Sequence, residues 1–131
     1  MKIASFAALG LLILTAPAFA HHPFASEFDA NAPVTLTGKL TKVDWNEPHV
    51  VFHVAVKDPG GETRDWSLEA ASPAMLERKG WTKTMLKEGD QITVRGYRAK
   101  SEPFTGSARS IELPGGKKMP SGDDNDGGPK I

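Results

Sequence analysis

The sequence predicts a small all-β domain, a five-stranded barrel with one short helix between the third and fourth strands. Alternating apolar residues recur in five segments, turn formers separate these segments, and the stretch after the third segment has the start and stop signals of a helix. Three strands, a helix and two more strands is the order typical of the OB-fold, a Greek-key barrel. An open antiparallel meander with the helix on one face is the alternative, but a closed barrel leaves fewer exposed strand edges, so we favour the barrel. The expected strands are 34–45, 49–57, 63–70, 91–99 and 107–113.

The first expected strand, 34–45, is long and changes phase along its length. Apolar residues alternate as far as Leu40, and the alternation resumes at Val43, one residue out of phase. A slip of this kind predicts a β-bulge near 41–42, where the strand can bend. A bend there would let one strand pair on both sides, as a small barrel requires.

The second and third expected strands should each turn one apolar face toward the core, because side chains alternate along a strand. His49 and His53 fall on the opposite, outer face of the second strand. The residues expected on the core face are Val50, Phe52, Val54, Val56, Trp66, Leu68 and Ala70.

The short helix has local signals at both ends. Ser72 can act as its N-cap and Pro73 as its first residue, and Gly80 suits the position just after its end. Only about two helical turns fit between these signals. We therefore expect the helix to cover one end of the barrel rather than to form a core of its own.

The first twenty residues have the form of a secretory signal peptide. Lys2 precedes an apolar run, and Ala18-Phe19-Ala20 fits the small-residue rule for cleavage. An uncleaved N-terminal anchor is the alternative. Cleavage after Ala20 would give a periplasmic or secreted protein that begins at His21 and inserts into no membrane. The expected organisation is a signal peptide at 1–20, an extended N-terminal arm at 21–33, the OB-like barrel at 34–113 and a disordered polar tail, rich in Gly, Pro, Lys and Asp, at 114–131.

Composition excludes several classes of function. Without cysteine, the protein can have neither disulfides nor a cysteine-based metal site. Removing the leader takes away one of 16 basic residues and none of 16 acidic residues, which leaves a net charge of −1 and no electrostatic basis for binding nucleic acid. We interpret the three tryptophans, Trp45, Trp66 and Trp81, as packing residues rather than base-stacking residues. The sequence has no G-x-S-x-G or H-E-x-x-H motif, so we expect the protein not to be an enzyme.

The mature N-terminus offers a metal site. If His21 is the first residue, its free α-amine and its ring can chelate an ion together, and His22 follows directly. A set of three nitrogen ligands suits copper above other first-row ions. His49 is the candidate for the further ligand, because it begins a strand beside a turn. We therefore predict that a divalent transition metal, copper in particular, binds at His21, His22 and His49.

His53 is not expected to share that ion. Four residues along a strand separate it from His49 by about 13 Å, whereas metal–nitrogen bonds are only about 2 Å long. A second hypothesis needs no metal at all. Two histidines at a chain start can simply be a solvated end, and the barrel could then be an interaction or structural module that contacts another protein of the cell envelope.

Several short motifs between residues 21 and 113 point to one family of proteins. A His-His pair at His21 is followed by a Trp-x-x-Pro-His turn that ends at His49, and later by Gly-Trp directly after the short helix. With these motifs, the chain resembles a family of small exported bacterial proteins that is classed as a domain of unknown function. The resemblance covers nearly the whole mature chain and implies no established activity, cofactor or partner. The further matching residues are Phe24, Phe28-Asp29, Leu36-Thr37-Gly38, Trp66-Ser67-Leu68-Glu69, Leu76-Glu77-Arg78-Lys79 and Gly89-Asp90.

Both histidine elements belong to the pattern of this family, which implies that they form one site. Two positions depart from the pattern. Pro23 stands where a serine usually follows the His-His pair, and Glu47 replaces the asparagine that usually precedes Pro-His. If the usual asparagine orients the histidine, Glu47 has to take over that role.

Overall fold

A computed structural model describes residues 22–131 of the chain. The predicted signal peptide, its cleavage site and His21 lie outside the described residues. No helix within 22–131 is long and apolar enough to cross a membrane. The elements in chain order are α1 (Phe24–Glu27), β1 (Phe28–Asp44), β2 (Val51–Lys57), β3 (Thr63–Glu69), α2 (Pro73–Arg78), β4 (Gln91–Ala99), β5 (Thr105–Glu112) and β6 (Lys118–Pro120).

The strands form one sheet that closes on itself. Hydrogen bonds connect neighbouring strands in the order β3-β2-β1-β4-β5-β6. A short parallel pairing of β3 with β5, from Ser67↔Thr105 to Glu69↔Ser107, joins the two sides of the sheet into a ring. This confirms the prediction of a small OB-like barrel with a helix between the third and fourth strands. The sequence analysis did not predict β6, a short strand that pairs with the far end of β5.

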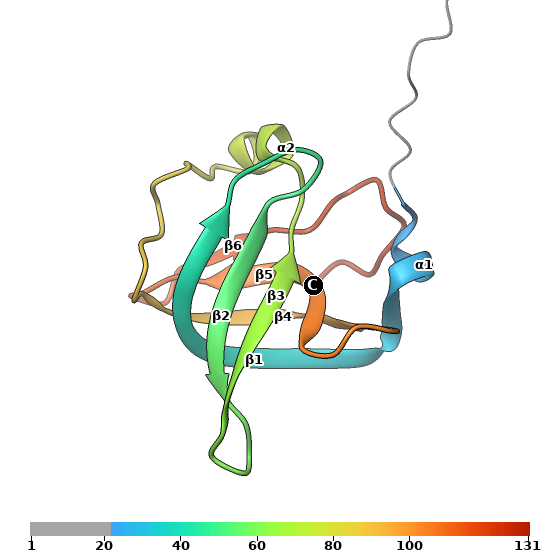
Figure 1. Cartoon of the computed structure of the whole chain (residues 1–131). Helices are drawn as coiled ribbons and strands as arrows, with labels where there is room; N and C mark the ends of the chain where they lie inside the picture. Colours follow the sequence, from blue (N-terminus) through green and yellow to red (C-terminus); the bar gives the residue numbers. More distant parts are fainter. Residues whose placement is uncertain (1–21) are drawn as a thin grey trace, which may run out of the picture.

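Strand β1 is the longest element and bends as predicted. Its first part pairs with β4 and its last part with β2, and the register shifts between Leu40 and Lys42, where the sequence indicated a bulge. Figure 1 shows β1 curving from below the other strands up along one side of the barrel. Near the bend, a Cβ at Gly38 would collide with the carbonyl oxygen of Ala55, so only glycine allows the two backbones to approach this closely.

The core lies inside the ring and is covered at one end by α2. All seven residues expected on the core faces of β2 and β3 are buried. Ser72 caps α2 by accepting a hydrogen bond from the Met75 backbone N–H at 3.3 Å, and Gly80 follows the helix with φ +96°, a left-handed value that glycine adopts without strain. Trp81 then packs on Phe52, with ring centroids 5.6 Å apart. Trp45 differs from the expectation, because it is only partly buried and packs against the edge of the core.

The two terminal segments are more ordered than the sequence predicts. The expected extended arm contains the helix α1 and the first residues of β1, so the strand begins at Phe28 rather than at residue 34. The backbone N–H of Phe24 donates to the carbonyl oxygen of Asp126 at 2.8 Å. In Figure 1, α1 and the red C-terminal segment accordingly lie beside each other on one flank of the barrel.

The disordered tail predicted for 114–131 is replaced by a segment that packs on the barrel. After β6, Ser121 is fully buried, accepts a hydrogen bond from the Ala71 backbone at 2.8 Å and donates one to the Arg109 carbonyl at 3.0 Å. The physical reason is Arg109, which points outward from β5 and is covered by this segment. A buried guanidinium needs carboxylate and carbonyl partners, and the polar tail supplies them.

Candidate functional site

His49 lies at the junction of the barrel and the C-terminal segment. Its Nδ1 is 3.0 Å from Oε1 of Glu69, which faces outward on the adjacent strand β3. Its Nε2 is 3.8 Å from Oδ2 of Asp123. The side chain of His49 is 18% exposed, whereas that of Asp123 is only 4% exposed. The ring is therefore held between a carboxylate on the barrel and a carboxylate on the tail.

The strand register brings Glu69 to this position. Val51 is opposite Glu69, and the Val50 backbone N–H donates to the Ala71 carbonyl at 3.0 Å. Residues two apart on a strand point to the same side. His49 and Glu69 consequently stand diagonally across two paired segments, on the outer side of the barrel.

The surroundings of Glu69 are acidic and partly enclosed. Burial raises the pKa of Glu69 above its usual range, and the nearby charges of Glu27 and Asp126 raise it further. His49 and, more weakly, His22 act in the opposite direction. His22 itself is exposed, yet it lies close enough to Glu69 to influence its charge. The pKa of Glu69 therefore reflects burial and two acidic neighbours, which raise it, against two histidines, which lower it.

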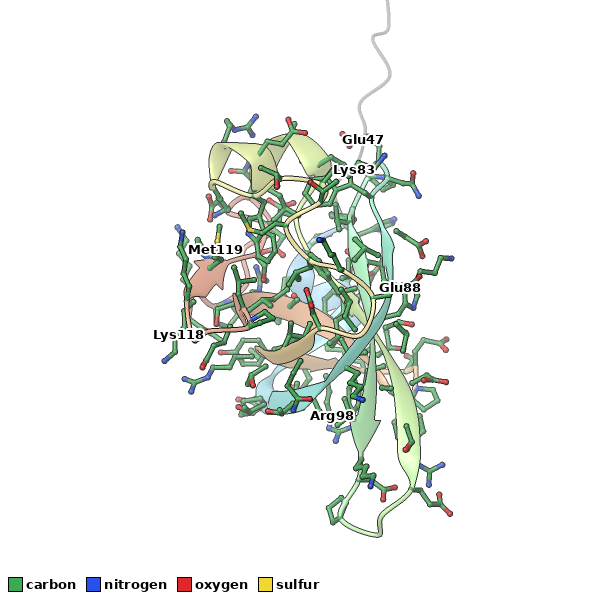
Figure 2. The ribbon with its side chains drawn as sticks, turned by 90° about the vertical axis from the view of Figure 1, so that its left-hand side faces the viewer. Glu47, Lys83, Glu88, Arg98, Lys118 and Met119 are labelled. Atoms are coloured by element: carbon green, nitrogen blue, oxygen red, sulfur yellow. The ribbon has the colours of Figure 1, made fainter. Side chains whose placement is uncertain are left out.

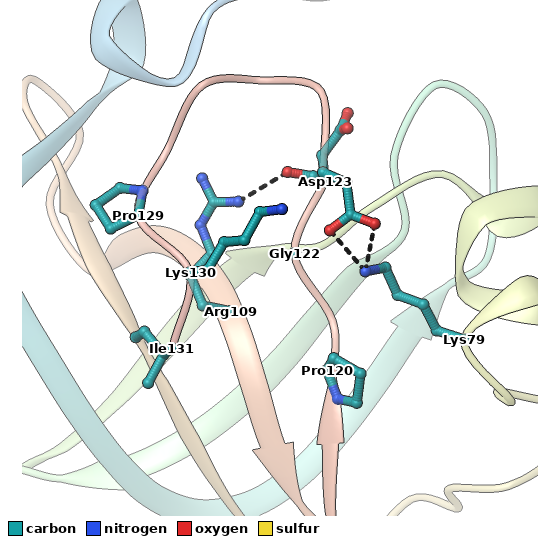
Figure 3. Close-up of a pocket in the computed structure, with 9 residues that line it drawn as sticks. Lys79, Arg109, Pro120, Gly122, Asp123, Pro129, Lys130 and Ile131 are labelled. Atoms are coloured by element: carbon teal, nitrogen blue, oxygen red, sulfur yellow. Dashed lines mark hydrogen bonds and ion pairs between the residues drawn. The ribbon is translucent and has the colours of Figure 1, made fainter.

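Arg109 fixes the segment that carries Asp123. Its guanidinium binds both carboxylate oxygens of Asp126, at 2.8 and 3.0 Å, and donates to the main-chain carbonyl of Asp123 at 3.1 Å. It also stacks on the ring of Phe24, with 4.6 Å between the guanidinium carbon and the ring centroid. Figure 3 shows Arg109 reaching from the barrel toward the main chain of Asp123. Because the side chain of Arg109 is only 2% exposed, these contacts bind the two termini firmly to β5.

The family model that matches this chain is a family of unknown function (DUF6152), over residues 8–108. The chain belongs to this family. The assignment confirms the resemblance inferred from the motifs, and it supplies no activity. No curated protein and no solved structure matches the chain significantly.

The stretch matched to DUF6152 contains part of the site and ends before the rest. His22, His49 and Glu69 lie within the matched residues, whereas Asp123 and Asp126 lie beyond residue 108. The tail carboxylates are therefore a feature of this DUF6152 chain outside the matched region.

Of the three predicted metal ligands, the structure describes two. His49 lies between Glu69 and Asp123, and His22 is exposed, while His21 lies outside the described residues. Sequence reasoning missed Glu69 and Asp123. Glu69 is not among the site residues that the sequence predicts, and Asp123 belongs to the segment that the sequence predicts to be a disordered polar tail. The burial of both depends on contacts between distant parts of the chain.

The described residues supply fewer metal ligands than an ion needs. Within 22–131, no group of three His, Asp or Glu side chains is placed to hold an ion. The distance of 3.8 Å between His49 Nε2 and Asp123 Oδ2 is nevertheless compatible with shared coordination. Metal bonds to nitrogen and oxygen are about 2.0–2.2 Å long, so two atoms on one ion can stand up to about 4.2 Å apart.

His53, within β2, forms a second histidine–carboxylate pair, whereas His49 lies two residues before this strand rather than at its start as predicted. Its Nε2 is 2.7 Å from Oδ2 of Asp44, its Nδ1 is 3.3 Å from the hydroxyl oxygen of Ser67, and Lys42 contacts Asp44 at 2.9 Å. The hydrogen bonds from Lys42 and His53 lower the pKa of Asp44. Ser, His and Asp also compose hydrolase triads, but there the aspartate binds Nδ1 and the serine Nε2, the reverse of the arrangement here.

Proposed function

We propose that this protein is an exported binding module that holds one divalent transition metal ion, copper in particular, through His21, His22 and His49. The observation that carries the proposal is the position of the His49 ring, with Nδ1 against Glu69 and Nε2 facing Asp123. Metal-binding histidines usually donate one ring N–H to a carboxylate, which fixes the ring and leaves the other nitrogen for the ion. Glu69 occupies that orienting position.

The remaining ligands would come from the mature N-terminus. Cleavage after Ala20 would give His21 a free α-amine beside its own imidazole, a chelating pair that needs no folding. His22 belongs to an arm whose next residues are fixed on the barrel, with Phe24 buried and bonded to Asp126. This attachment supports the proposal, because a fixed arm would lower the entropy cost of bringing the N-terminus to His49.

Asp123 adds a carboxylate to the histidine set of the original hypothesis. An oxygen ligand beside several nitrogen ligands remains compatible with Cu²⁺, and nitrogen-rich coordination favours copper over Mg²⁺ or Ca²⁺. Export would suit this chemistry, because the chain contains no cysteine that an oxidising compartment or a copper ion could oxidise.

The test is calorimetric titration of Cu²⁺ into mature protein purified from the periplasm and stripped of metal. We expect one ion per chain, and affinity that falls below about pH 6, where imidazoles take up protons. His49→Ala should weaken binding by about 100-fold or more, because it removes the ligand fixed by the barrel. His53→Ala is the matched control and should bind like the parent, because His53 faces the same outer side of the barrel four residues further along and has its own carboxylate partner.

A further variant tests the role of the N-terminus. One methionine added before His21 should weaken binding about as much as His49→Ala, because it separates the α-amine from the His21 ring. Unchanged copper affinity in His49→Ala would show that the two histidine elements do not form one site. The protein would then be better described as an interaction or structural module of the cell envelope.

A further inference from the structure

A cleft opens at the end of the barrel opposite α2, far from His49. It lies where β2 ends, β3 begins and the loop between β4 and β5 turns, and it has a volume of about 500 Å³. Figure 2 shows Arg98, on its rim, toward the end of the molecule away from Glu47 and α2. Mouths of β-barrels are common places for ligand sites, and this volume falls in their usual range. One carboxylate, that of Asp58, also lines the cleft. The apolar side chains that line it are Leu36, Val56, Pro59, Trp66 and Phe104.

One wall of the cleft is aromatic and is held in an unusual conformation. Phe104 is one of two large apolar side chains in residues 22–131 that are clearly exposed, at 37%. It is also the one described non-glycine residue with positive φ, at 49°. Its ring stands edge-on to Trp66, with centroids 5.7 Å apart. A bulky residue in the left-handed region is rare, and such backbone conformations concentrate at binding sites.

The cleft also carries positive charge that the described residues do not neutralise. Arg64 stacks on Phe104 and is paired with Asp58 and Glu62. Arg98 lies 4.9 Å from the centroid of the Trp66 ring, and Lys57 lines the same cleft. In residues 22–131, neither Arg98 nor Lys57 has a carboxylate within ion-pair distance. The cleft therefore combines an exposed aromatic ring with two unpaired cations.

We propose that this cleft binds a small organic carboxylate with a flat apolar body. The body would lie against the exposed ring of Phe104, which the buried Trp66 supports from behind, and the carboxylate would accept hydrogen bonds from Arg98 and Lys57. A guanidinium that already stacks on an indole keeps its N–H groups free at the edge of its plane for such an acceptor. The net charge of −1 on the mature chain disfavours long polyanions, and an open cleft of this size suits a single small molecule. This site is independent of the metal site.

The test uses 2-naphthoate and its neutral analogue 2-naphthamide as probes of the metal-free mature protein. Binding is followed by NMR, through the indole N–H signal of Trp66 and the backbone signals of 98–104. We expect saturable binding of 2-naphthoate at these signals, and binding of 2-naphthamide that is about tenfold weaker. Phe104→Ala should weaken the binding of both probes, because their naphthalene rings lose the aromatic wall of the cleft.

Charge variants separate a built site from nonspecific attraction. Arg98→Gln should weaken the binding of 2-naphthoate about tenfold and leave the binding of 2-naphthamide nearly unchanged. Arg95→Gln is the matched control, because Arg95 is an exposed residue of the same strand that does not line the cleft. Equal losses in the two arginine variants would overturn the proposal, and so would the absence of 2-naphthoate binding at these signals. Tighter binding of a short acidic peptide at the same signals would also overturn it in favour of a protein partner.

Discussion

His49, which lies just before β2, and His53, within β2, face the same outer side of the barrel, and each is paired with a carboxylate, but their surroundings differ. His53 and Asp44 lie beside Lys42, with side chains 27% and 33% exposed. His49 and Glu69 are only slightly less exposed, at 18% and 31%, but a second carboxylate, Asp123, faces the His49 ring from the C-terminal segment. The pKa values of the two paired carboxylates shift in opposite directions. Burial raises the pKa of Glu69, and hydrogen bonds from neighbours lower that of Asp44.

This difference teaches that the surroundings of His49 depend on the C-terminal segment rather than on the barrel strands. The strands alone provide two similar histidine–carboxylate pairs. Only the pair at His49 has a second carboxylate facing the ring, and that carboxylate comes from the C-terminal segment. Variants of the C-terminal segment should therefore change the environment of the His49 ring and leave that of the His53 ring unchanged.

The largest effect is expected from deleting residues 121–131. The deletion removes the carboxylate and carbonyl partners of Arg109 and the acceptor for the Ala71 backbone N–H. We expect a loss of about 4–6 kcal/mol in the free energy of unfolding, measured with urea. NMR should show a changed environment for the His49 ring and an unchanged one for His53. Deleting 129–131 alone is the control and should cost under about 1 kcal/mol. A parent-like stability after the longer deletion would mean that this segment is only a tail.

The next largest effect is expected from breaking the ion pair between Arg109 on β5 and Asp126 in the C-terminal segment. Asp126→Ala removes the carboxylate that binds the buried guanidinium of Arg109 through two hydrogen bonds. Leaving a buried charge without its partner should cost about 3–5 kcal/mol. Asp124→Ala is the matched control, because Asp124 is half exposed and pairs with Lys79 on the surface. That variant should cost at most about 1 kcal/mol. Equal urea midpoints for the two variants would contradict the role assigned to Arg109.

A smaller effect of opposite sign is expected at Glu69. Because its folded-state pKa is raised, the ionised carboxylate is less favourable in the folded protein than in the unfolded chain. This penalty is absent when the pH is below 4.5, the pKa of the glutamate side chain in the unfolded chain, and it is complete when the pH is above the folded-state pKa. Glu69→Gln should therefore raise the melting temperature of the metal-free protein at pH 7, and the gain should shrink toward pH 4. A lower melting temperature at pH 7 would show that the bond to His49 outweighs the burial of charge.

The smallest effect is expected at Asp44. Its lowered pKa means that the ionised carboxylate stabilises the folded state above the unfolded value of 3.8, and this contribution disappears as the pH falls through the folded pKa. Asp44→Asn should therefore lower the melting temperature slightly at pH 7 and not at all near pH 2. Melting curves of Asp44→Asn and Glu69→Gln across this pH range should thus run in opposite directions. If both variants changed the melting temperature at pH 7 in the same direction, the contrast between the His49–Glu69 and His53–Asp44 pairs would be wrong.

Local signals in the sequence predicted most of the barrel. The alternation of Val50, Phe52 and Val54 identifies a core-facing strand, because one side of each strand must be apolar to be buried. Ser72-Pro73 and Gly80 define the helix for equally local reasons, since they satisfy or terminate backbone hydrogen bonds within a few residues. The phase slip after Leu40 likewise located the bulge.

The terminal segments could not be predicted in this way. The stretch after residue 113 has the composition of a disordered tail, and it is ordered because β5 presents Arg109 on its outer side. No residue pattern within the C-terminal segment itself indicates that it will pack against that guanidinium. The cleft is similar, because Phe104 and Arg98 flank the β4–β5 loop while Trp66 comes from a strand more than thirty residues earlier in the chain.

By itself, the sequence determined the existence of five of the six strands, the ends of α2, the absence of cysteine chemistry and the histidines that the hypothesis uses. These depend on hydrogen bonds and side-chain alternation within short stretches of chain. Only the tertiary structure decided that Glu69 and Asp123 flank His49 while Asp44 flanks His53. That choice depends on strand register and on a buried charge at Arg109, both of which involve partners far apart in the chain.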